Sequence, residues 1–204
     1  MSSPSAAERV SVGSQLGALP NLLSLGRIAL VPVIAALVYS STPAARLVAG
    51  GLFVVACITD FLDGWLARRH GITTALGQFL DPLADKLLVC TALIMMVGHG
   101  PSPRVSAWMV AVIVVRELAV TGLRGIAVRE GVVLPAEELG KYKVVFQMFA
   151  VDGLLIHHRY GIPGIPLAID FAAAGALFMW VALVFSIWSC LDYFIRVSRR
   201  LSFA

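Results

Sequence analysis

Residues 47–68 read LVAGGLFVVACITDFLDGWLAR, an apolar run that is followed by two aspartates. As a helix, the run at 47–58 would be only about 17 Å long, roughly half of the hydrocarbon core of a bilayer. Asp60 and Asp63 are three residues apart, so a helix presents both carboxylates on one face. The stretch therefore predicts a membrane helix with one apolar end and one acidic end.

A second acidic stretch follows at residues 77–86, which read GQFLDPLADK. Asp81 and Asp85 are four residues apart and would also share one face of a helix. The link at residues 69–76 is short, which predicts that the two helices are antiparallel neighbours. Four carboxylates could then converge from two helices.

The composition is that of a membrane protein of one domain. The chain has 204 residues, of which 59% are hydrophobic and 14% charged, against about 45–50% and about 25% in soluble domains. The net charge of +4 does not indicate a nucleic-acid partner, because the basic residues lie between apolar runs rather than along one solvated face. The three cysteines lie inside apolar stretches and are expected to be buried thiols.

Apolar segments separated by Gly and Pro residues predict an all-α membrane fold with six transmembrane helices. The segments are 22–40, 45–68, 78–98, 105–128, 143–156 and 166–194. Residues 1–19 would be an N-terminal segment with a short interfacial helix at 6–19, residues 20–197 the catalytic transmembrane domain, and residues 198–204 a cytoplasmic tail. No signal peptide is recognisable, so the first membrane helix is expected to stay in the mature protein.

The basic residues are distributed unequally between the two ends of these segments. One side would collect Arg9, Arg27, Arg68, Arg69, Arg124, Arg129, Lys141, Lys143, Arg196, Arg199 and Arg200, and the other only Arg46, Arg104 and Arg159. The positive-inside rule makes the first side cytoplasmic, with both termini in the cytoplasm. A multi-pass protein of a bacterial inner membrane is expected.

Three segments have short apolar runs, at 47–58, 87–98 and 105–115. Because successive helices alternate in direction, the polar end of each falls on the cytoplasmic side. The fifth segment opens with Lys141 and Lys143 on that side as well. The pattern predicts a polar cavity in the cytoplasmic half of the bundle, where the active site would lie.

The four aspartates are candidate metal ligands. An ionised Asp inside a membrane helix costs on the order of 3 kcal/mol, and four together would repel one another. Divalent cations would neutralise them, and oxygen ligands favour Mg²⁺, with Mn²⁺ as the second choice and two ions per site. The alternative is that the carboxylates face the cytoplasm or pair with Arg68, Arg69 and Lys86.

The two acidic stretches together resemble the signature D-x2-D-G-x2-A-R-x8-G-x3-D-x3-D of the CDP-alcohol phosphotransferase family. Every fixed position matches: Asp60, Asp63, Gly64, Ala67, Arg68, Gly77, Asp81 and Asp85. The resemblance implies a membrane fold of six helices, commonly a homodimer, that transfers a phosphatidyl-type group from a CDP-linked donor and releases CMP. It also implies that the four aspartates bind two metal ions and that Asp85 is the general base. Asp63, Gly64, Ala67, Arg68 and Gly77 would surround the CDP group.

Motifs outside the signature are similar to one branch of the family, the phosphatidylglycerophosphate synthases. These motifs are residues 20–24 with Arg27, 79–86, Arg116-Glu117, 120–124 and 140–143. That branch uses CDP-diacylglycerol and sn-glycerol 3-phosphate. Ser24 stands where Thr is commoner, and Val144 where a Thr often follows the second lysine.

Basic residues support an anionic acceptor independently of the resemblance. Arg116 follows an eleven-residue apolar run and should point into the cavity, because a lipid-facing guanidinium would be costly there. With Arg124, Lys141 and Lys143 it could bind the acceptor phosphate, and Glu117 could pair with any of these bases. The alternative is that Arg124, Lys141 and Lys143 serve only as positive-inside residues.

Two other functions remain open at this stage. The same chemistry with another acceptor would make cardiolipin or phosphatidylinositol phosphate. A cation transporter could use the aspartates as an ion path, although such proteins often show internal repeats, and this sequence shows none.

Overall fold

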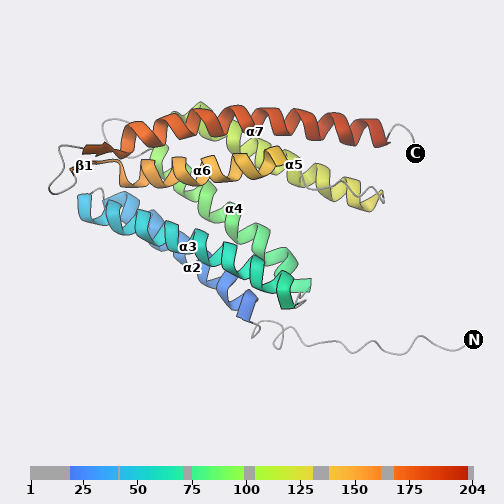
Figure 1. The fold of residues 1–204 in the computed structure, drawn as a ribbon, viewed down its shortest axis with the longest axis horizontal. Coiled ribbons are helices and arrows are strands. Elements are labelled where there is room, and N and C mark those ends of the chain that lie inside the picture. The colour runs from blue at the N-terminus through green and yellow to red at the C-terminus, as the bar shows by residue number, and fades with distance from the viewer. Residues whose placement is uncertain are drawn as a thin grey trace, which may run out of the picture.

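The computed structural model describes residues 19–40, 42–70, 75–98, 104–130, 138–161 and 168–201. This part of the chain is mainly helical (Figure 1). The helices are α2 (Leu19–Ser40), α3 (Pro43–His70), α4 (Ala75–Val97), α5 (Ala107–Arg129), α6 (Glu138–Ile156) and α7 (Phe171–Leu201). Each corresponds to one predicted apolar segment. The predicted interfacial helix at 6–19 lies outside the described residues, except for Leu19, where α2 begins.

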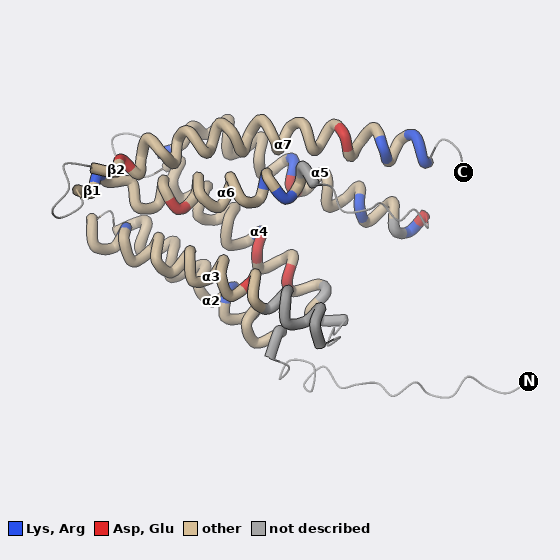
Figure 2. The backbone as a smooth tube through the Cα atoms, in the orientation of Figure 1, with Lys and Arg blue, Asp and Glu red and all other residues tan. Residues whose placement is uncertain are grey.

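The helices form one elongated bundle in which successive helices run in opposite directions. In Figure 1 the start of α2, the end of α3, the end of α5 and the end of α7 lie toward the right. The short strands β1 (Arg159–Gly161) and β2 (Ala168–Asp170) lie at the opposite end. We call these the near end and the distal end. Lys and Arg residues gather at the near end of α5 and α7 (Figure 2).

The β-hairpin was not predicted from the sequence. Arg159 pairs with Asp170 and Gly161 with Ala168 in an antiparallel register. The prediction that the sixth helix begins at residue 166 is wrong, because residues 168–170 pair as a strand and α7 begins only at Phe171. Asp170 sets that boundary by accepting a hydrogen bond from the Ala173 amide at 2.9 Å, an N-cap contact. At its other end α7 continues through Leu201.

Thr42 sets the start of α3 in a similar way. Its hydroxyl accepts a hydrogen bond from the Ala45 amide at 3.2 Å. Pro43 occupies the first helical position, where its missing N–H costs nothing and its fixed φ favours the helix. The turn between α2 and α3 can therefore be short.

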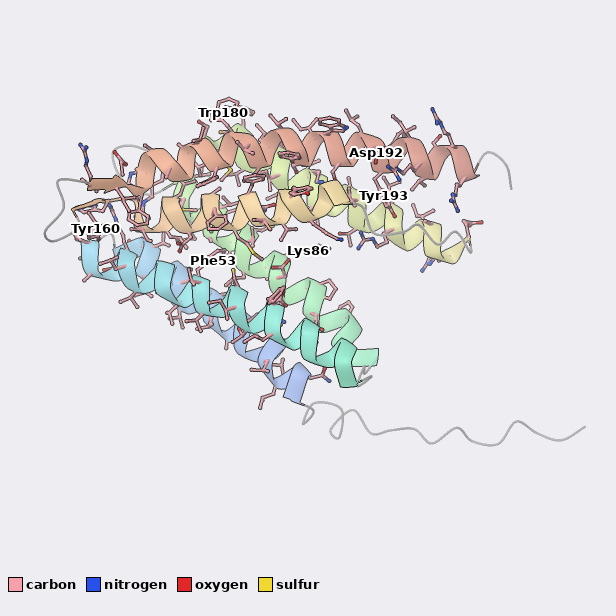
Figure 3. The ribbon with its side chains drawn as sticks, in the orientation of Figure 1. Phe53, Lys86, Tyr160, Trp180, Asp192 and Tyr193 are labelled. Atoms are coloured by element: carbon pink, nitrogen blue, oxygen red, sulfur yellow. The ribbon has the colours of Figure 1, made fainter. Side chains whose placement is uncertain are left out.

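The core is apolar along the middle of the bundle. Its fully buried large side chains include Phe53, Leu93, Ile113, Leu154 and Met179, and Figure 3 shows Phe53 on α3. Helices α6 and α7 approach most closely at two glycines. A Cβ on Gly153 would lie 2.8 Å from the Gly175 Cα, so a side chain at either glycine would push the backbones apart.

Helix α2 packs extensively against both α3 and α4. The sequence predicted that α3 and α4 are antiparallel neighbours. They do run antiparallel across the 71–74 link, but α2 is the helix on which both of them pack within the described residues. The acidic faces of α3 and α4 therefore meet through side chains of α2.

Three of the described helices are long and apolar enough to cross a membrane. These spans are Asn21–Ser40, Pro43–Leu62 and Phe171–Arg200, with mean hydropathies of 2.1, 1.8 and 2.0. Helices α4, α5 and α6 have 23, 23 and 19 residues and carry three, four and four charged side chains. Some of these, together with Arg27 of α2 and Asp60 of α3, form the candidate site.

Candidate active site

One face of α2 carries three buried polar residues in an otherwise apolar helix. Asn21 and Ser24 are fully buried and Arg27 is 3% exposed. Their spacing of three residues places them on a single face, which turns toward α3 and α4. Burying polar groups in an apolar environment is unfavourable unless they find partners. This face therefore indicates a polar centre between the three helices.

Arg27 joins carboxylates from two different helices. Its Nη1 forms an ion pair with Oδ1 of Asp60 on α3. Its Nη2 lies 3.7 Å from Oδ1 of Asp81 on α4, and the Ser24 hydroxyl donates a hydrogen bond to the same oxygen. We call these four residues the Arg27 cluster. It confirms that the acidic stretches converge, at least for Asp60 and Asp81. The described partner of both carboxylates is Arg27, whereas the alternative partners considered from the sequence were Arg68, Arg69 and Lys86.

The Arg27 cluster has more negative than positive charge. One guanidinium faces two carboxylates, and the Asp60 and Asp81 side chains remain 36% and 48% exposed. Among the residues whose side chains are described, no three of His, Cys, Asp or Glu stand close enough to hold a metal ion. The side chain of Asp63, the remaining predicted ligand on α3, lies outside that description. The carboxylate oxygens present are nevertheless hard ligands of the kind that Mg²⁺ and Mn²⁺ prefer.

A pocket lies between α4, α5 and α6, next to the Arg27 cluster. We call it the lysine pocket, and Figure 3 labels Lys86 on its α4 wall. It is lined by Asp85, Lys86, Val89, Cys90, Glu117, Lys143, Val144, Gln147 and Met148. Five of these nine residues are polar or charged, which agrees with the predicted polar cavity, and its position on the cytoplasmic side stays a prediction.

Asp85 lies between the two groups of charges. It interacts electrostatically with Asp60 and Arg27 of the Arg27 cluster, and with Lys143 and Lys86 of the lysine pocket. Lys86 donates a hydrogen bond to the hydroxyl of Thr121 on α5, which holds its ammonium on the pocket wall. A carboxylate here can accept a proton from a molecule bound in the pocket.

Glu117 organises the basic side of the lysine pocket. Its Oε1 accepts a hydrogen bond from the ammonium of Lys143. The same oxygen accepts a hydrogen bond from the Nη1 of Arg116 at 3.2 Å. The expected pairing of Glu117 with nearby bases is confirmed. Lys143 is 4% exposed, so its charge depends on this carboxylate.

Arg116 points toward α7 rather than into the lysine pocket. Its Nε donates to the Ser186 carbonyl at 3.2 Å, and its Nη2 donates to the Ser189 hydroxyl. Both serines are buried. Arg116 avoids lipid as expected, but the expectation that it points into the cavity is wrong, because its contacts with these serines make it a link between α5 and α7.

The other predicted site residues are distributed as follows. Arg124 and Lys141 are exposed at the near end, and Gly77 is buried at the start of α4. The backbones of Asp63, Gly64, Ala67 and Arg68 belong to α3, but their side chains lie outside the described part of the molecule. The structure thus brings together Asp60 and Asp81, and separately Asp85 with Lys143.

Several contributors to the site were not among the predicted site residues. They are Ser24, Arg27, Lys86 and Gln147. The sequence does contain a signal for the α2 residues, since Asn21, Ser24 and Arg27 recur at a helical spacing inside an apolar segment. From the sequence, Arg27 was placed on the basic side of the membrane and in a motif of the family branch, but was given no role in the site.

The fold and the site define a helical membrane protein with ion pairs between its helices inside the bundle. Comparison with known proteins is specific: the family model for CDP-alcohol phosphatidyltransferases matches residues 17–188. The chain belongs to this family. It is a membrane-bound transferase of phospholipid biosynthesis, as the signature at residues 60–85 predicted.

Individual relatives share most of their length with this chain. A CDP-diacylglycerol–glycerol-3-phosphate 3-phosphatidyltransferase of Bacillus subtilis is 42% identical over 188 residues, which cover 86% of this chain and 93% of the relative. A protein of the same name from Rickettsia bellii is 37% identical, with 86% and 93% covered. A probable phosphatidylglycerophosphate synthase of Mycobacterium tuberculosis is 38% identical, with 91% and 84% covered.

Proposed function

We propose that the protein transfers the phosphatidyl group of CDP-diacylglycerol to sn-glycerol 3-phosphate, giving phosphatidylglycerophosphate and CMP. The observation that carries this proposal is the position of Asp85 between an acidic cluster and a pocket with two lysines. The carboxylates of the Arg27 cluster suit a pyrophosphate whose charge is neutralised by cations. The lysines of the lysine pocket suit an anionic acceptor. The names of the relatives agree with both substrates.

Asp60, Asp63, Asp81 and Asp85 would hold the divalent ions, Mg²⁺ or Mn²⁺, with two per site. Bound ions would neutralise the pyrophosphate and the leaving phosphate. The excess of carboxylate over guanidinium in the Arg27 cluster supports this assignment, because a cation would balance it. The partial exposure of Asp60 and Asp81 leaves their oxygens accessible.

Asp85 is assigned as the general base. It would take the proton from the primary hydroxyl of the acceptor as the hydroxyl oxygen forms a bond to the phosphorus that carries the diacylglycerol. The bond from that phosphorus to the oxygen of the CMP phosphate breaks, and CMP leaves with the electron pair. Lys143 and Lys86 beside Asp85 would hold the acceptor phosphate and so orient the hydroxyl.

Arg124, Lys141 and Arg116 are proposed to assist acceptor binding from outside the lysine pocket. Arg124 and Lys141 are exposed at the near end, where they would attract an anion to the pocket mouth. Arg116 would act through Glu117, whose carboxylate it shares with Lys143. Asp63, Gly64, Ala67, Arg68 and Gly77 would surround the CDP group, with small residues that let the nucleotide approach the helix backbones.

All six helices are proposed to span the bacterial inner membrane, with the near end and both termini in the cytoplasm. Helices α4 and α5 would be about 35 Å long and α6 about 28 Å at 1.5 Å per residue, enough for a bilayer core of about 30 Å. Their charged residues Asp81, Asp85, Lys86, Glu117 and Lys143 lie in the Arg27 cluster or the lysine pocket and so do not require contact with lipid. A homodimer is proposed from membership of the family.

Release of CMP from the purified protein tests the reaction. With CDP-diacylglycerol and Mg²⁺, CMP is expected only when sn-glycerol 3-phosphate is added, and EDTA should abolish it. Labelled phosphatidylglycerol and inositol phosphate, offered in parallel, test the sister activities. Efficient turnover of either of these, but not of glycerol 3-phosphate, would replace the assigned acceptor. Ion flux through proteoliposomes without CMP release would indicate a transporter.

A further inference from the structure

A group of buried polar atoms without hydrogen-bond partners lies at the distal end, away from the active site. Arg104, in the connection between α4 and α5, is 7% exposed. Its Nη1 donates to the Leu155 carbonyl near the end of α6 at 3.3 Å, whereas its Nη2 is buried with no hydrogen-bond partner. A buried charged donor without a partner is unfavourable, and native proteins rarely leave one.

Two neighbouring side chains also have a buried nitrogen without a hydrogen-bond partner. The Nε of Arg46, in the first turns of α3, and the Nδ1 of His157, just after α6, are also buried without partners. Burial, and then the charge of Arg46, lowers the pKa of Arg104 to about 10. Burial, and then the charges of Arg104 and Arg46, lowers the pKa of His157. The three groups are therefore close enough to repel one another, and we call them the distal cluster.

The chain supplies little negative charge to balance them. At this end Asp170 already caps α7, and its effect on the pKa of His157 is the smallest of those acting on it. Oδ1 of Asp152, one turn before Leu155 on α6, is buried without a hydrogen-bond partner, so it does not bond either guanidinium. Residues 99–103 and 162–167, which lie outside the described part of the chain, include neither Asp nor Glu.

We infer that Arg46, Arg104 and His157 form a binding site for a phosphate oxyanion at the distal end of the bundle. Guanidinium N–H groups match phosphate oxygens in both geometry and charge. The start of α3, which carries Arg46, adds the partial positive charge of a helix N-terminus. The phosphate could belong to a phospholipid headgroup of the adjacent leaflet or be free in solution.

Binding to the full-length protein in detergent tests this site. The probes are dioleoyl phosphatidylglycerol and, separately, inorganic phosphate, each titrated at constant ionic strength while the thermal unfolding midpoint is followed. Arg46→Gln should raise the dissociation constant of the probe, read from the shift of the unfolding midpoint with probe concentration, at least about ten-fold. The reason is that a charge-assisted contact is lost. Arg159→Gln is the matched control, because Arg159 is exposed on β1 at the same end.

The outcomes separate the sources of the phosphate. Stabilisation by the lipid alone identifies a headgroup, and stabilisation by both probes identifies an oxyanion site that also takes free phosphate. Lipid that binds elsewhere on the protein shifts the unfolding midpoint of every variant equally, so it does not affect the difference between variants. Arg104→Lys, which keeps the charge in the buried position, serves as a second variant and should weaken binding less than Arg46→Gln.

Two results would overturn the inference. One is an equal response of Arg46→Gln and wild type to both probes, and the other is an equal loss in Arg159→Gln, which would indicate only general surface charge. Release of CMP by Arg46→Gln is expected to stay within about twofold of wild type, because the distal cluster lies at the other end of the bundle from Asp85. The test is thus independent of the proposed reaction.

Discussion

The Arg27 cluster and the lysine pocket are neighbouring polar regions in which charges are paired differently. In the Arg27 cluster one guanidinium serves two carboxylates that are 36% and 48% exposed. Around Glu117 one carboxylate is shared by two cations, Lys143 and Arg116, and Lys143 is almost fully buried. The first region has an excess carboxylate, which suits a cation, whereas the lysine pocket presents the ammonium groups of Lys86 and Lys143, which under the proposed reaction would bind an anionic acceptor.

Asp85 lies between the two regions, and its loss should have the largest effect. Asp85→Asn is expected to lower the rate of CMP release by about 10³-fold, because general-base catalysis contributes about 10²–10⁴-fold. The isosteric amide cannot accept the proton, but it should leave the fold intact. Asp192→Asn, which removes a carboxylate paired with Arg196 on α7, is the matched control and should be nearly neutral. Near-normal turnover by Asp85→Asn would remove Asp85 from the role of base.

The lysine pocket can be tested with two lysines of one helix. Lys143→Gln should raise the KM for sn-glycerol 3-phosphate by about 100-fold, the upper end of what one charge-assisted contact contributes. The KM for CDP-diacylglycerol should change little. Lys141→Gln, at an exposed position two residues away, should change either KM by less than about threefold. Equal effects of the two substitutions would place the acceptor phosphate outside the pocket.

The Arg27 cluster can be tested through stability in the absence of metal. Arg27→Gln leaves Asp60 and Asp81 without their shared cation and should lower the free energy of unfolding in EDTA by about 2 kcal/mol. This is less than the about 3–5 kcal/mol of a fully buried pair, since both carboxylates are partly exposed. Added Mg²⁺ should raise the thermal unfolding midpoint more in this variant than in wild type. An identical response to Mg²⁺ in both proteins would contradict a cation site at these carboxylates.

Arg116 should have the smallest direct effect on the reaction. Arg116→Ala is expected to raise the KM for sn-glycerol 3-phosphate about threefold, through the repositioning of Glu117 and Lys143, and to affect the CDP-lipid less. It should also lower the unfolding midpoint, because the contacts with Ser186 and Ser189 on α7 are lost. Arg116→Lys tests the positioning role, since it keeps the charge but not the fork that reaches both serines. Equal losses for both substrates would exclude Arg116 from the acceptor side.

Much of this architecture could be predicted because it depends on local sequence. Helices of about 20 residues follow from apolar runs between Gly and Pro, and the position of Asp60 after residues 47–58 fixes its place near one end of α3. The hairpin at 159–170 could not be predicted in this way, because strand pairing joins two short segments across a loop. Nor could the start of α7 at Phe171, which depends on that pairing.

By itself the sequence determined the helices, their alternating directions, the acidic signature and hence the family. Only the tertiary structure decided that Arg27 would join Asp60 to Asp81, that Arg116 would turn toward α7, and that Lys143 would share Glu117. The physical reason is that hydrophobic periodicity acts along one helix. The partner of a buried charge, in contrast, depends on how each helix is rotated and packed against its neighbours.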